Sequence, residues 1–435
     1  MEKNKLKELL IEHKGKFLSR RGLIRREVQD DILKYIKQKE AILITGIRRG
    51  GKSSLMRLLC DDIMLGFNVP VSNILYLNFE DDRCVDFTIK DFDPLYETFI
   101  EIENPKGRKY FFLDEIQNVK GWEKWINRLY ELEDVKVFIT GSNAAMLSSE
   151  ISTALTGRNR QIIIWPFSFY EFLTIRGYSF DKNSFYIREK KAGLKRLFKE
   201  YIEFGGFPEV IKISDTTLLE QYFKDIIYRD VITRYSIRNI KEIKELTLFL
   251  ASNLGTVQSY KNLKELIGVK SLNTVKNYLD ALSSVFLFFY IDLFSYSVKQ
   301  QIYNPSKVYC IDTALSNAIS FKFSKNMGHI YENLVYIELK RRNRDVYYWK
   351  SRRGREVDFV VKKGLKIEEA IQVSVSLSDK SSKEREMRAL MDAKEEIKSY
   401  SLIILTEDEE REENIGNMKI NIIPLWKWLL LQEKI

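Results

Sequence analysis

Apolar stretches of strand length alternate with helical spacing through the first 170 residues. Apolar runs at 41–45, 74–79, 110–113, 137–140 and 161–165 each end in glycine, polar or proline residues. After the first run, Leu55, Met56, Leu59 and Ile63 recur at the spacing of one helix face. Buried strands that alternate with helices predict a mostly parallel α/β sheet, with ligands at the carboxyl ends of its strands.

The segment GIRRGGKSS joins the first predicted strand to the first predicted helix. Gly46, four further residues and then Gly51-Lys52-Ser53 complete the pattern GxxxxGK[ST]. In this context backbone N–H groups and a helix N-terminus converge on phosphate, although a glycine turn with an incidental lysine is the plainer interpretation. We expect Lys52 to contact the β- and γ-phosphates of ATP and Ser53 to ligate Mg²⁺. The expected nucleotide-binding residues are Gly46, Ile47, Arg48, Arg49, Gly50, Gly51, Lys52, Ser53 and Ser54.

Two further strand ends carry polar residues that suit this chemistry. Tyr110–Leu113 runs directly into Asp114 and Glu115. We expect Asp114 to hold Mg²⁺ and Glu115 to polarise the attacking water. Val137–Thr140 ends in Gly-Ser-Asn, where Asn143, or else Ser142, would position that water or sense the γ-phosphate. A turn or helix cap is the structural alternative for these two residues.

The motifs GIRRGGKSS, YFFLDEIQ, VFITGSN, LTGR and WPFSFYEF resemble the AAA-type P-loop ATPases of archaea and bacteria. They are most similar to the branch with a C-terminal restriction-endonuclease-like domain. The resemblance gives Lys52 and Ser53 the Walker A positions, Asp114 and Glu115 the Walker B positions, and Asn143 the first sensor. It makes Arg158, in LTGR, an arginine finger that can act on a neighbouring subunit. A surface ion pair is the alternative for Arg158.

The middle of the chain is predicted to be largely helical. Through the resemblance, residues 171–240 correspond to a helical lid, in which Arg229 and, more weakly, Arg234 are candidates for contact with the phosphates. In residues 241–320, three helices precede two β-like stretches, an order typical of a winged helix-turn-helix. The third helix would present polar residues to DNA, or the module would pack on the lid and touch no DNA. These residues are Lys270, Ser271, Asn273, Thr274, Lys276 and Asn277.

Residues 321–435 resemble the core of the PD-(D/E)xK nucleases, with a helix, a hairpin and a third strand, which we expect at 370–377. Glu332 and Asp358 match its two acidic, metal-binding positions. Gln372-Val373-Ser374 stands where (D/E)-x-K is required, so we expect a domain that binds nucleic acid or a partner and cuts poorly or not at all. Lys380 is a candidate replacement for the missing lysine. Clustered arginines support polyanion binding: Arg341, Arg342, Arg344, Arg352, Arg353 and Arg355.

Composition and net charge limit the kinds of partner and the cellular compartment that we expect for this protein. The chain has 435 residues and a net charge of +10, which suits a polyanion such as DNA or, equally, a lysine-rich solvated surface. Three scattered cysteines and two histidines predict neither a disulfide framework nor a zinc site and fit a reducing cytoplasm. The longest apolar runs are too short to cross a membrane. Two basic pairs, Arg20-Arg21 and Arg25-Arg26, either form a solvated face or contact nucleotide or nucleic acid.

These observations predict an α/β protein: an AAA-type P-loop sheet (1–170), a helical lid (171–240), a winged helix-turn-helix (241–320) and an α/β nuclease-like domain (321–435). Three hypotheses remain open for its function. In the first, ATP hydrolysis is coupled to DNA binding. In the second, ATP gates a nuclease at Glu332 and Asp358. In the third, the nucleotide acts as a switch that recruits a protein partner. A homo-oligomer follows if Arg158 acts in a neighbouring subunit.

Overall fold

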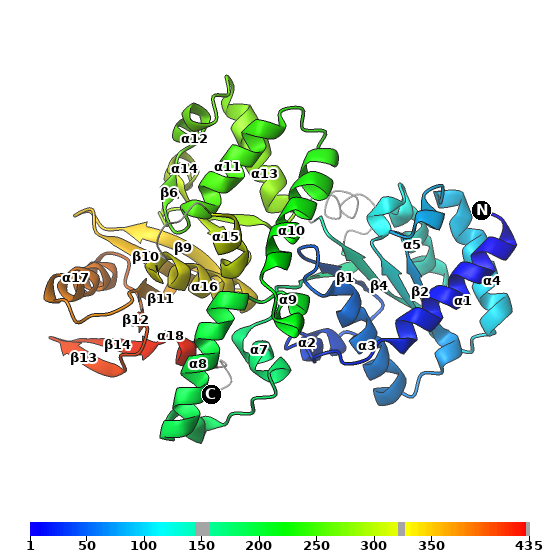
Figure 1. The fold of residues 1–435 in the computed structure, drawn as a ribbon, viewed down its shortest axis with the longest axis horizontal. Coiled ribbons are helices and arrows are strands. Elements are labelled where there is room, and N and C mark those ends of the chain that lie inside the picture. The colour runs from blue at the N-terminus through cyan, green and yellow to red at the C-terminus, as the bar shows by residue number, and fades with distance from the viewer. Residues whose placement is uncertain (144–156, 321–326, 432–435) are drawn as a thin grey trace. The chain divides into compact units, whose positions relative to one another are not determined.

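The computed structural model describes residues 1–143, 157–320 and 327–431. The chain forms two compact units, which are described separately below (Figure 1). The first comprises Met1–Trp165 with Ser284–Phe286, and the second comprises Pro166–Ser283 with Leu287–Ile435.

The first unit is built on a five-stranded sheet in the order β2-β3-β4-β1-β5. All neighbouring strands are parallel, which confirms the predicted parallel sheet. Because β4 lies between β1 and β3, the carboxyl ends of these three strands are adjacent along one edge. The strands are β1 (Ala41–Thr45), β2 (Ile74–Asn78), β3 (Lys109–Asp114), β4 (Val135–Gly141) and β5 (Asn159–Ile163).

Helices cover both faces of this sheet. Alternate strand residues point to opposite faces, so Leu43 joins the core under α4 and α5, whereas Ile42 and Ile44 join the core under α2 and α3. The helices are α1 (Lys3–Ser19), α2 (Gln29–Leu33), α3 (Lys52–Gly66), α4 (Phe92–Glu103) and α5 (Trp122–Leu132). Short 3₁₀ turns occur at Val71–Asn73, Asp82–Cys84, Ile89–Asp91 and Ile116–Asn118.

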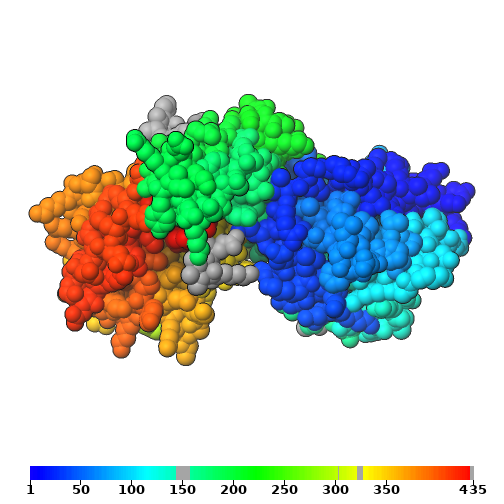
Figure 2. Space-filling model, turned by 90° about the horizontal axis from the view of Figure 1, so that it is seen from below, coloured from blue at the N-terminus to red at the C-terminus, as the bar shows by residue number. Residues whose placement is uncertain are grey.

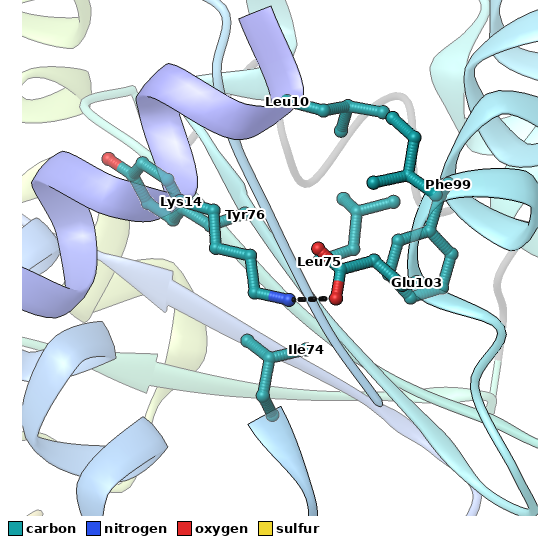
Figure 3. Close-up of a pocket in the computed structure, with 8 residues that line it drawn as sticks. Leu10, Lys14, Ile74, Leu75, Tyr76, Phe99 and Glu103 are labelled. Atoms are coloured by element: carbon teal, nitrogen blue, oxygen red, sulfur yellow. Dashed lines mark ion pairs between the residues drawn. The ribbon is translucent and has the colours of Figure 1, made fainter. Parts of the chain in front are cut away.

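Helix α1 packs against the edge strand β2 and beside α4 (Figure 1). Figure 3 shows the small void enclosed there, into which Lys14 and Glu103 point toward each other with 2.8 Å between Nζ and Oε2. Its volume of about 10 Å³ is that of a single water probe, and its other walls include Leu10, Ile74 and Phe99. This void is a detail of packing and is too small to bind a ligand.

The second unit begins with helices and a small antiparallel sheet in the order β6-β8-β7. Helices α11, α12 and α13 precede most of that sheet, in the order expected from the sequence. The helices are α7 (Phe169–Ile175), α8 (Arg188–Phe204), α9 (Pro208–Ile213), α10 (Thr217–Asp225), α11 (Ile240–Ser252), α12 (Tyr260–Leu266), α13 (Leu272–Ser284), α14 (Val298–Tyr303) and α15 (Thr313–Ile319). The other elements are a 3₁₀ turn at Lys182–Phe185, a π-helix at Ile226–Thr233, and strands β6 (Val257–Gln258), β7 (Phe288–Ile291) and β8 (Ser306–Cys310).

The rest of this unit is a six-stranded mixed sheet in the order β13-β14-β12-β11-β10-β9. Apolar residues of α17 cover one face of it, and α8 lies beside the C-terminal α18, as the green and red surfaces of Figure 2 show. The predicted third strand at 370–377 lies earlier, because the hairpin after β10 turns at Gly364. The elements are α16 (Met327–Arg341), β9 (Asp345–Lys350), β10 (Glu356–Lys363), β11 (Lys366–Val373), α17 (Lys380–Glu396), β12 (Ser401–Thr406), β13 (Arg411–Ile415), β14 (Met418–Pro424) and α18 (Leu425–Trp428). Among the described residues, no helix is both long and apolar enough to cross a membrane.

Candidate functional site

The glycine loop after β1 adopts a backbone that only its glycines allow. Gly46 has φ 149° and Gly51, which precedes the first residue of α3, has φ 98°. A Cβ atom on Gly46 would lie 2.3 Å from the carbonyl oxygen of Ile164, which follows β5. The loop therefore passes directly against the backbone of a neighbouring segment. It delivers the N-terminus of the 15-residue helix α3 to the carboxyl edge of the sheet.

Lys52 is buried within this loop. Its Nζ donates hydrogen bonds to the carbonyl oxygens of Gly46, at 3.1 Å, and Ile47, at 3.3 Å. It also lies 3.4 Å from Oε1 of Glu115, across the carboxyl edge of the sheet. The structure therefore brings together the predicted phosphate-binding lysine and the predicted catalytic glutamate.

Asp114, at the end of β3, is the second group that the structure brings to the loop. Its carboxylate accepts hydrogen bonds from the hydroxyls of Ser53, Thr140 and Tyr76, the last at 2.9 Å. Burial and the neighbouring charge of Glu115 raise the pKa of Asp114. The Ser53 hydroxyl and the Asp114 carboxylate are oxygen ligands of the kind that Mg²⁺ prefers, and a site of this type takes its remaining ligands from water and phosphate.

Glu115 has a left-handed backbone with φ 53°, which is uncommon for a residue with a side chain. Its N–H donates to the Thr140 hydroxyl at 2.9 Å, and its Oε2 accepts from the Ser142 N–H at 3.3 Å and from the side-chain amide of Gln117. Burial favours the neutral acid, but Lys52 and Gln117 outweigh it and lower the pKa of Glu115. The side chain is therefore a fixed, ionised carboxylate.

The residues after β4 lie beside these acids. Ser142 and Asn143 are both buried, and the backbone contact of Ser142 with Glu115 places this strand end at the site. Both residues remain candidates for the sensor. Residues 144–156, which include the start of the LTGR motif at Leu155-Thr156, lie outside the described part of the chain.

Arg158 lies at the opposite edge of the same sheet. Its carbonyl accepts from the N–H of Ala41, the first residue of β1, and its guanidinium pairs with Glu131 at 2.7 Å and lies over the Tyr130 ring. Because β1 runs the height of the sheet between them, Arg158 does not reach the glycine loop of its own chain. Action of Arg158 as an arginine finger on a neighbouring subunit stays a prediction.

Several residues at the site were not predicted, or were predicted only loosely. Arg26, from one of the basic pairs, is buried and donates to the carbonyls of Gly50, at 3.3 Å, and Trp165, at 2.7 Å. Thr140 joins Asp114 to Glu115, and Tyr76 supports Asp114 from β2. A polar residue at the end of an apolar strand is the signal that could have identified Thr140.

A second group of charged residues lies in a cleft of about 460 Å³ within the second unit. Glu332 of α16 and Asp358 of β10, the two expected metal ligands, meet there with Glu356. Lys307 of β8 lies among them, and its Nζ is 2.9 Å from Glu332, 3.1 Å from Asp358 and 2.7 Å from Glu356. Sequence analysis had found the two acids but missed the lysine.

The charged groups at this cleft shift one another's pKa values. Burial and the charge of Glu332 raise the pKa of Asp358. Burial lowers the affinity of Lys307 for its proton, but the three carboxylates outweigh it and hold the pKa of Lys307 well above its ordinary value. The three carboxylates therefore favour the charged, ammonium form of Lys307.

The departure from the nuclease pattern has a structural counterpart. Gln372, in place of the third-strand acid, accepts from the N–H of Asp358 at 3.1 Å and donates to Glu386. Lys380, the expected replacement for the missing lysine, is an exposed residue at the start of α17 and does not line the cleft. That expectation was wrong, because the lysine among the acids comes from β8.

The predicted basic cluster is partly neutralised by neighbouring acids. Arg341 and Arg342 pair with Glu338, and Arg344 pairs with Glu368 at 2.7 Å. Arg353 and Arg355 share Asp392, at 3.5 and 3.0 Å. These arginines therefore offer less positive charge to a polyanion than the sequence suggested.

Comparison with known proteins defines the class of the first unit. The family described as "AAA domain" matches residues 38–173, which contain the glycine loop, the acidic pair and all five strands of the parallel sheet. The first unit is thus an AAA-type P-loop ATPase domain. Residues 195–326 and 327–428 match two domains of unknown function, DUF8612 and DUF4143. Neither of these matches is to a winged helix or a nuclease.

The whole chain belongs to the family of the uncharacterized protein MJ1544 of Methanocaldococcus jannaschii. The two are 37% identical over 428 residues, which cover 94% of this chain and 91% of MJ1544. An uncharacterized protein of Haemophilus influenzae is 29% identical over 95% of this chain and 98% of its own length. Among solved structures, the Walker-type ATPase PABY2304 of Pyrococcus abyssi is 13% identical, covers 70% of this chain and 99% of its own, and has a TM-score of 0.44.

Proposed function

We propose that the first unit binds ATP with Mg²⁺ at residues 46–54 and hydrolyses it with Glu115 as the residue that polarises water. The convergence of Lys52, Ser53, Asp114 and Glu115 at one sheet edge carries this proposal. The two pairs reach the edge from two segments that are about 60 residues apart in the sequence, which a chance match to a glycine pattern would not produce.

Each group has a distinct role in this proposal. The loop N–H groups and Lys52 hold the phosphates, and Ser53 and Asp114 hold Mg²⁺, which would neutralise charge on the transferred phosphoryl group. Glu115 accepts a hydrogen bond from water, and Ser142 and Gln117 fix its carboxylate in place. Asn143 is the proposed sensor of the γ-phosphate.

The test is ATP turnover by the Glu115→Gln variant. We expect turnover to fall by about 10²–10³-fold while ATP binding is retained, because the amide keeps the shape but cannot act as a base. Glu97→Gln, on the exposed side of α4, is the matched control and should change neither quantity. Full turnover by Glu115→Gln would overturn the assignment.

We further propose that hydrolysis is coupled to DNA binding through residues 241–320, with α13 as the contacting element. The residues that lead into and begin α13 are polar and exposed, which supports this proposal. They include Lys270, Ser271, Asn273, Lys276 and Asn277. Basic and amide side chains at the start of a helix are suited to phosphates and base edges. Residues 321–435 are proposed to be a nuclease-like module that does not cut nucleic acid.

Duplex binding at two salt concentrations tests the coupling. Replacing Lys270 and Lys276 by alanine should weaken binding and reduce the salt dependence by about two counter-ions. Lys363 and Lys366, at the exposed hairpin between β10 and β11, provide a control pair of equal charge. ATP turnover that ignores DNA would instead favour a nucleotide switch that recruits a protein partner.

A further inference from the structure

Lys307 lies at the centre of the carboxylate cluster that borders the cleft of the second unit. It extends from β8, outside the six-stranded sheet, and its side chain is only 2% exposed. One ammonium group therefore satisfies carboxylates from two other elements, Glu332 of α16 and both Glu356 and Asp358 of β10, at 2.7–3.1 Å.

Each of the two expected metal ligands already accepts two hydrogen bonds from the protein. Oε1 of Glu332 accepts from both Lys307 and the Tyr309 hydroxyl, the latter at 2.7 Å. Oδ1 of Asp358 accepts from Lys307, and Oδ2 accepts from the N–H of Val373 at 3.0 Å. Oε2 of Glu332 lies 3.8 Å from Nδ1 of His329 and close to Gly255, where an added Cβ atom would be 2.6 Å away.

A divalent cation does not fit this arrangement. Mg²⁺ requires close contact with oxygen ligands, whereas the ammonium of Lys307 already lies between the same oxygens and would repel a second cation at short range. No group of three His, Cys, Asp or Glu side chains with metal-binding geometry occurs within the described ranges. The nuclease resemblance implies a metal that these residues do not accommodate.

The same contacts join two parts of the unit that match different domain families. Beside Lys307, Asn333 of α16 pairs through its side-chain amide with the backbone N–H and carbonyl of Cys310 on β8, at 2.8 and 3.0 Å. The N–H of Phe294 donates to the carbonyl of Tyr348 on β9 at 2.7 Å. The cluster around Lys307 thus lies within the seam between residues 195–326 and 327–428.

We propose that Lys307 replaces the divalent metal of this cleft, so that the carboxylates serve as an ion-pair joint between the two regions and become a metal site only when the lysine charge is removed. This proposal is independent of ATP hydrolysis in the first unit. It predicts that the wild-type cleft is not a metal-dependent nuclease site, and that a single substitution exposes its ligands.

Binding of Mn²⁺ to nucleotide-free, chelator-treated full-length protein tests the proposal. Lys307→Met should bind one Mn²⁺ at least tenfold more tightly than wild type, and Mn²⁺ should raise its melting temperature. Adding Asp358→Asn should abolish both effects, which separates this cleft from any metal bound at Asp114. Lys307→Arg retains the charge and should not gain Mn²⁺ binding.

Two results would overturn the proposal. Wild-type protein that binds Mn²⁺ in a manner lost with Asp358→Asn would show that Lys307 acts beside a metal instead of replacing it. Failure of both Lys307→Met and Lys307→Gln to gain Mn²⁺ would show that the carboxylates do not form a latent site. Lys307→Gln provides a polar side chain should the methionine variant fold poorly, and the wild-type measurement needs no variant.

Discussion

Each unit holds a buried lysine beside acidic residues, but the two lysines are held in opposite ways. Lys52 contacts two carbonyls of its own loop and a single carboxylate at 3.4 Å. Lys307 contacts three carboxylates at 2.7–3.1 Å. A weakly paired lysine can transfer its contacts to an anionic ligand, whereas a lysine that already contacts three carboxylates has no contact to spare. The comparison separates a binding site from a structural joint.

The same substitution at the two lysines should give opposite results, and this is the largest expected effect. Lys52→Met should reduce ATP turnover by about 10²-fold or more, because a positive charge at the phosphates is lost. Lys307→Met should leave turnover within twofold but lower the free energy of unfolding by about 3–5 kcal/mol, because buried carboxylates lose their partner. Steady-state ATPase assays and urea unfolding of both variants measure the two effects. A large loss of turnover in Lys307→Met would break the comparison.

One glycine beside each lysine site, Gly46 and Gly255, provides a second comparison of the two units. In Gly46→Ala the new methyl group meets the Ile164 carbonyl at 2.3 Å, a backbone atom that cannot yield, so we expect ATP affinity to fall at least tenfold. In Gly255→Ala the new methyl group lies 2.6 Å from the carboxylate of Glu332, a side chain that can rotate away. The left-handed φ of 69° at this position should itself cost about 1–2 kcal/mol of stability in alanine. Nucleotide titration and thermal unfolding distinguish the two outcomes. Gly15→Ala, in open space on α1, serves as the control for both.

How much the sequence predicted follows the same division. The glycine loop, Asp114 and Glu115 belong to short segments whose strand, loop and helix patterns are local, so both the sheet and the convergence of its ends were predictable. Lys307 is 25 residues from Glu332 and 51 from Asp358, on a strand of a different sheet. No spacing rule connects them, because only the tertiary packing of β8 against α16 brings the ammonium to the acids.

Arg158 and Arg26 illustrate the same limit in the first unit. Both were identified as arginines with candidate roles, but sequence does not tell which edge of a sheet a residue occupies. Arg158 precedes β5 and therefore lies at the amino-terminal edge. Arg26 reaches Trp165 across 139 residues and supports the loop at the carboxyl edge. The direction of β5 fixes the position of Arg158, and a long-range contact fixes the position of Arg26.

A smaller effect is expected where the loop is supported from outside. Arg26→Met removes hydrogen bonds to Gly50 and Trp165, so the loop should be less well ordered and ATP affinity should fall about 3–10-fold, which corresponds to about 1 kcal/mol. Arg25→Met, at a half-exposed neighbour that pairs with Asp30, is the control. Isothermal titration with ATP measures both. Equal effects of the two variants would remove Arg26 from the site.

Lys136 shows what burial does to a lysine without a carboxylate partner. Its Nζ donates to the carbonyls of Tyr35, Gln38 and Glu40 at 2.6–3.1 Å. Burial and the charge of Arg108 lower the pKa of Lys136 to about 7, the reverse of the shift at Lys307.

The sign of the resulting pH dependence follows from proton binding. An unfolded lysine has a pKa near 10.4, so between about pH 7 and 10.4 the unfolded chain binds more protons at this position and the free energy of unfolding rises with pH. We expect the free energy of unfolding of the wild type minus that of Lys136→Met to be constant below pH 7 and to increase by roughly 1–3 kcal/mol up to pH 9.5. Urea unfolding at pH 6, 7 and 9.5 measures it, with Lys124→Met on the exposed face of α5 as the control. A difference that shrinks as pH rises would mean that the three carbonyls stabilise the ammonium, and that carboxylates are not what distinguishes Lys307.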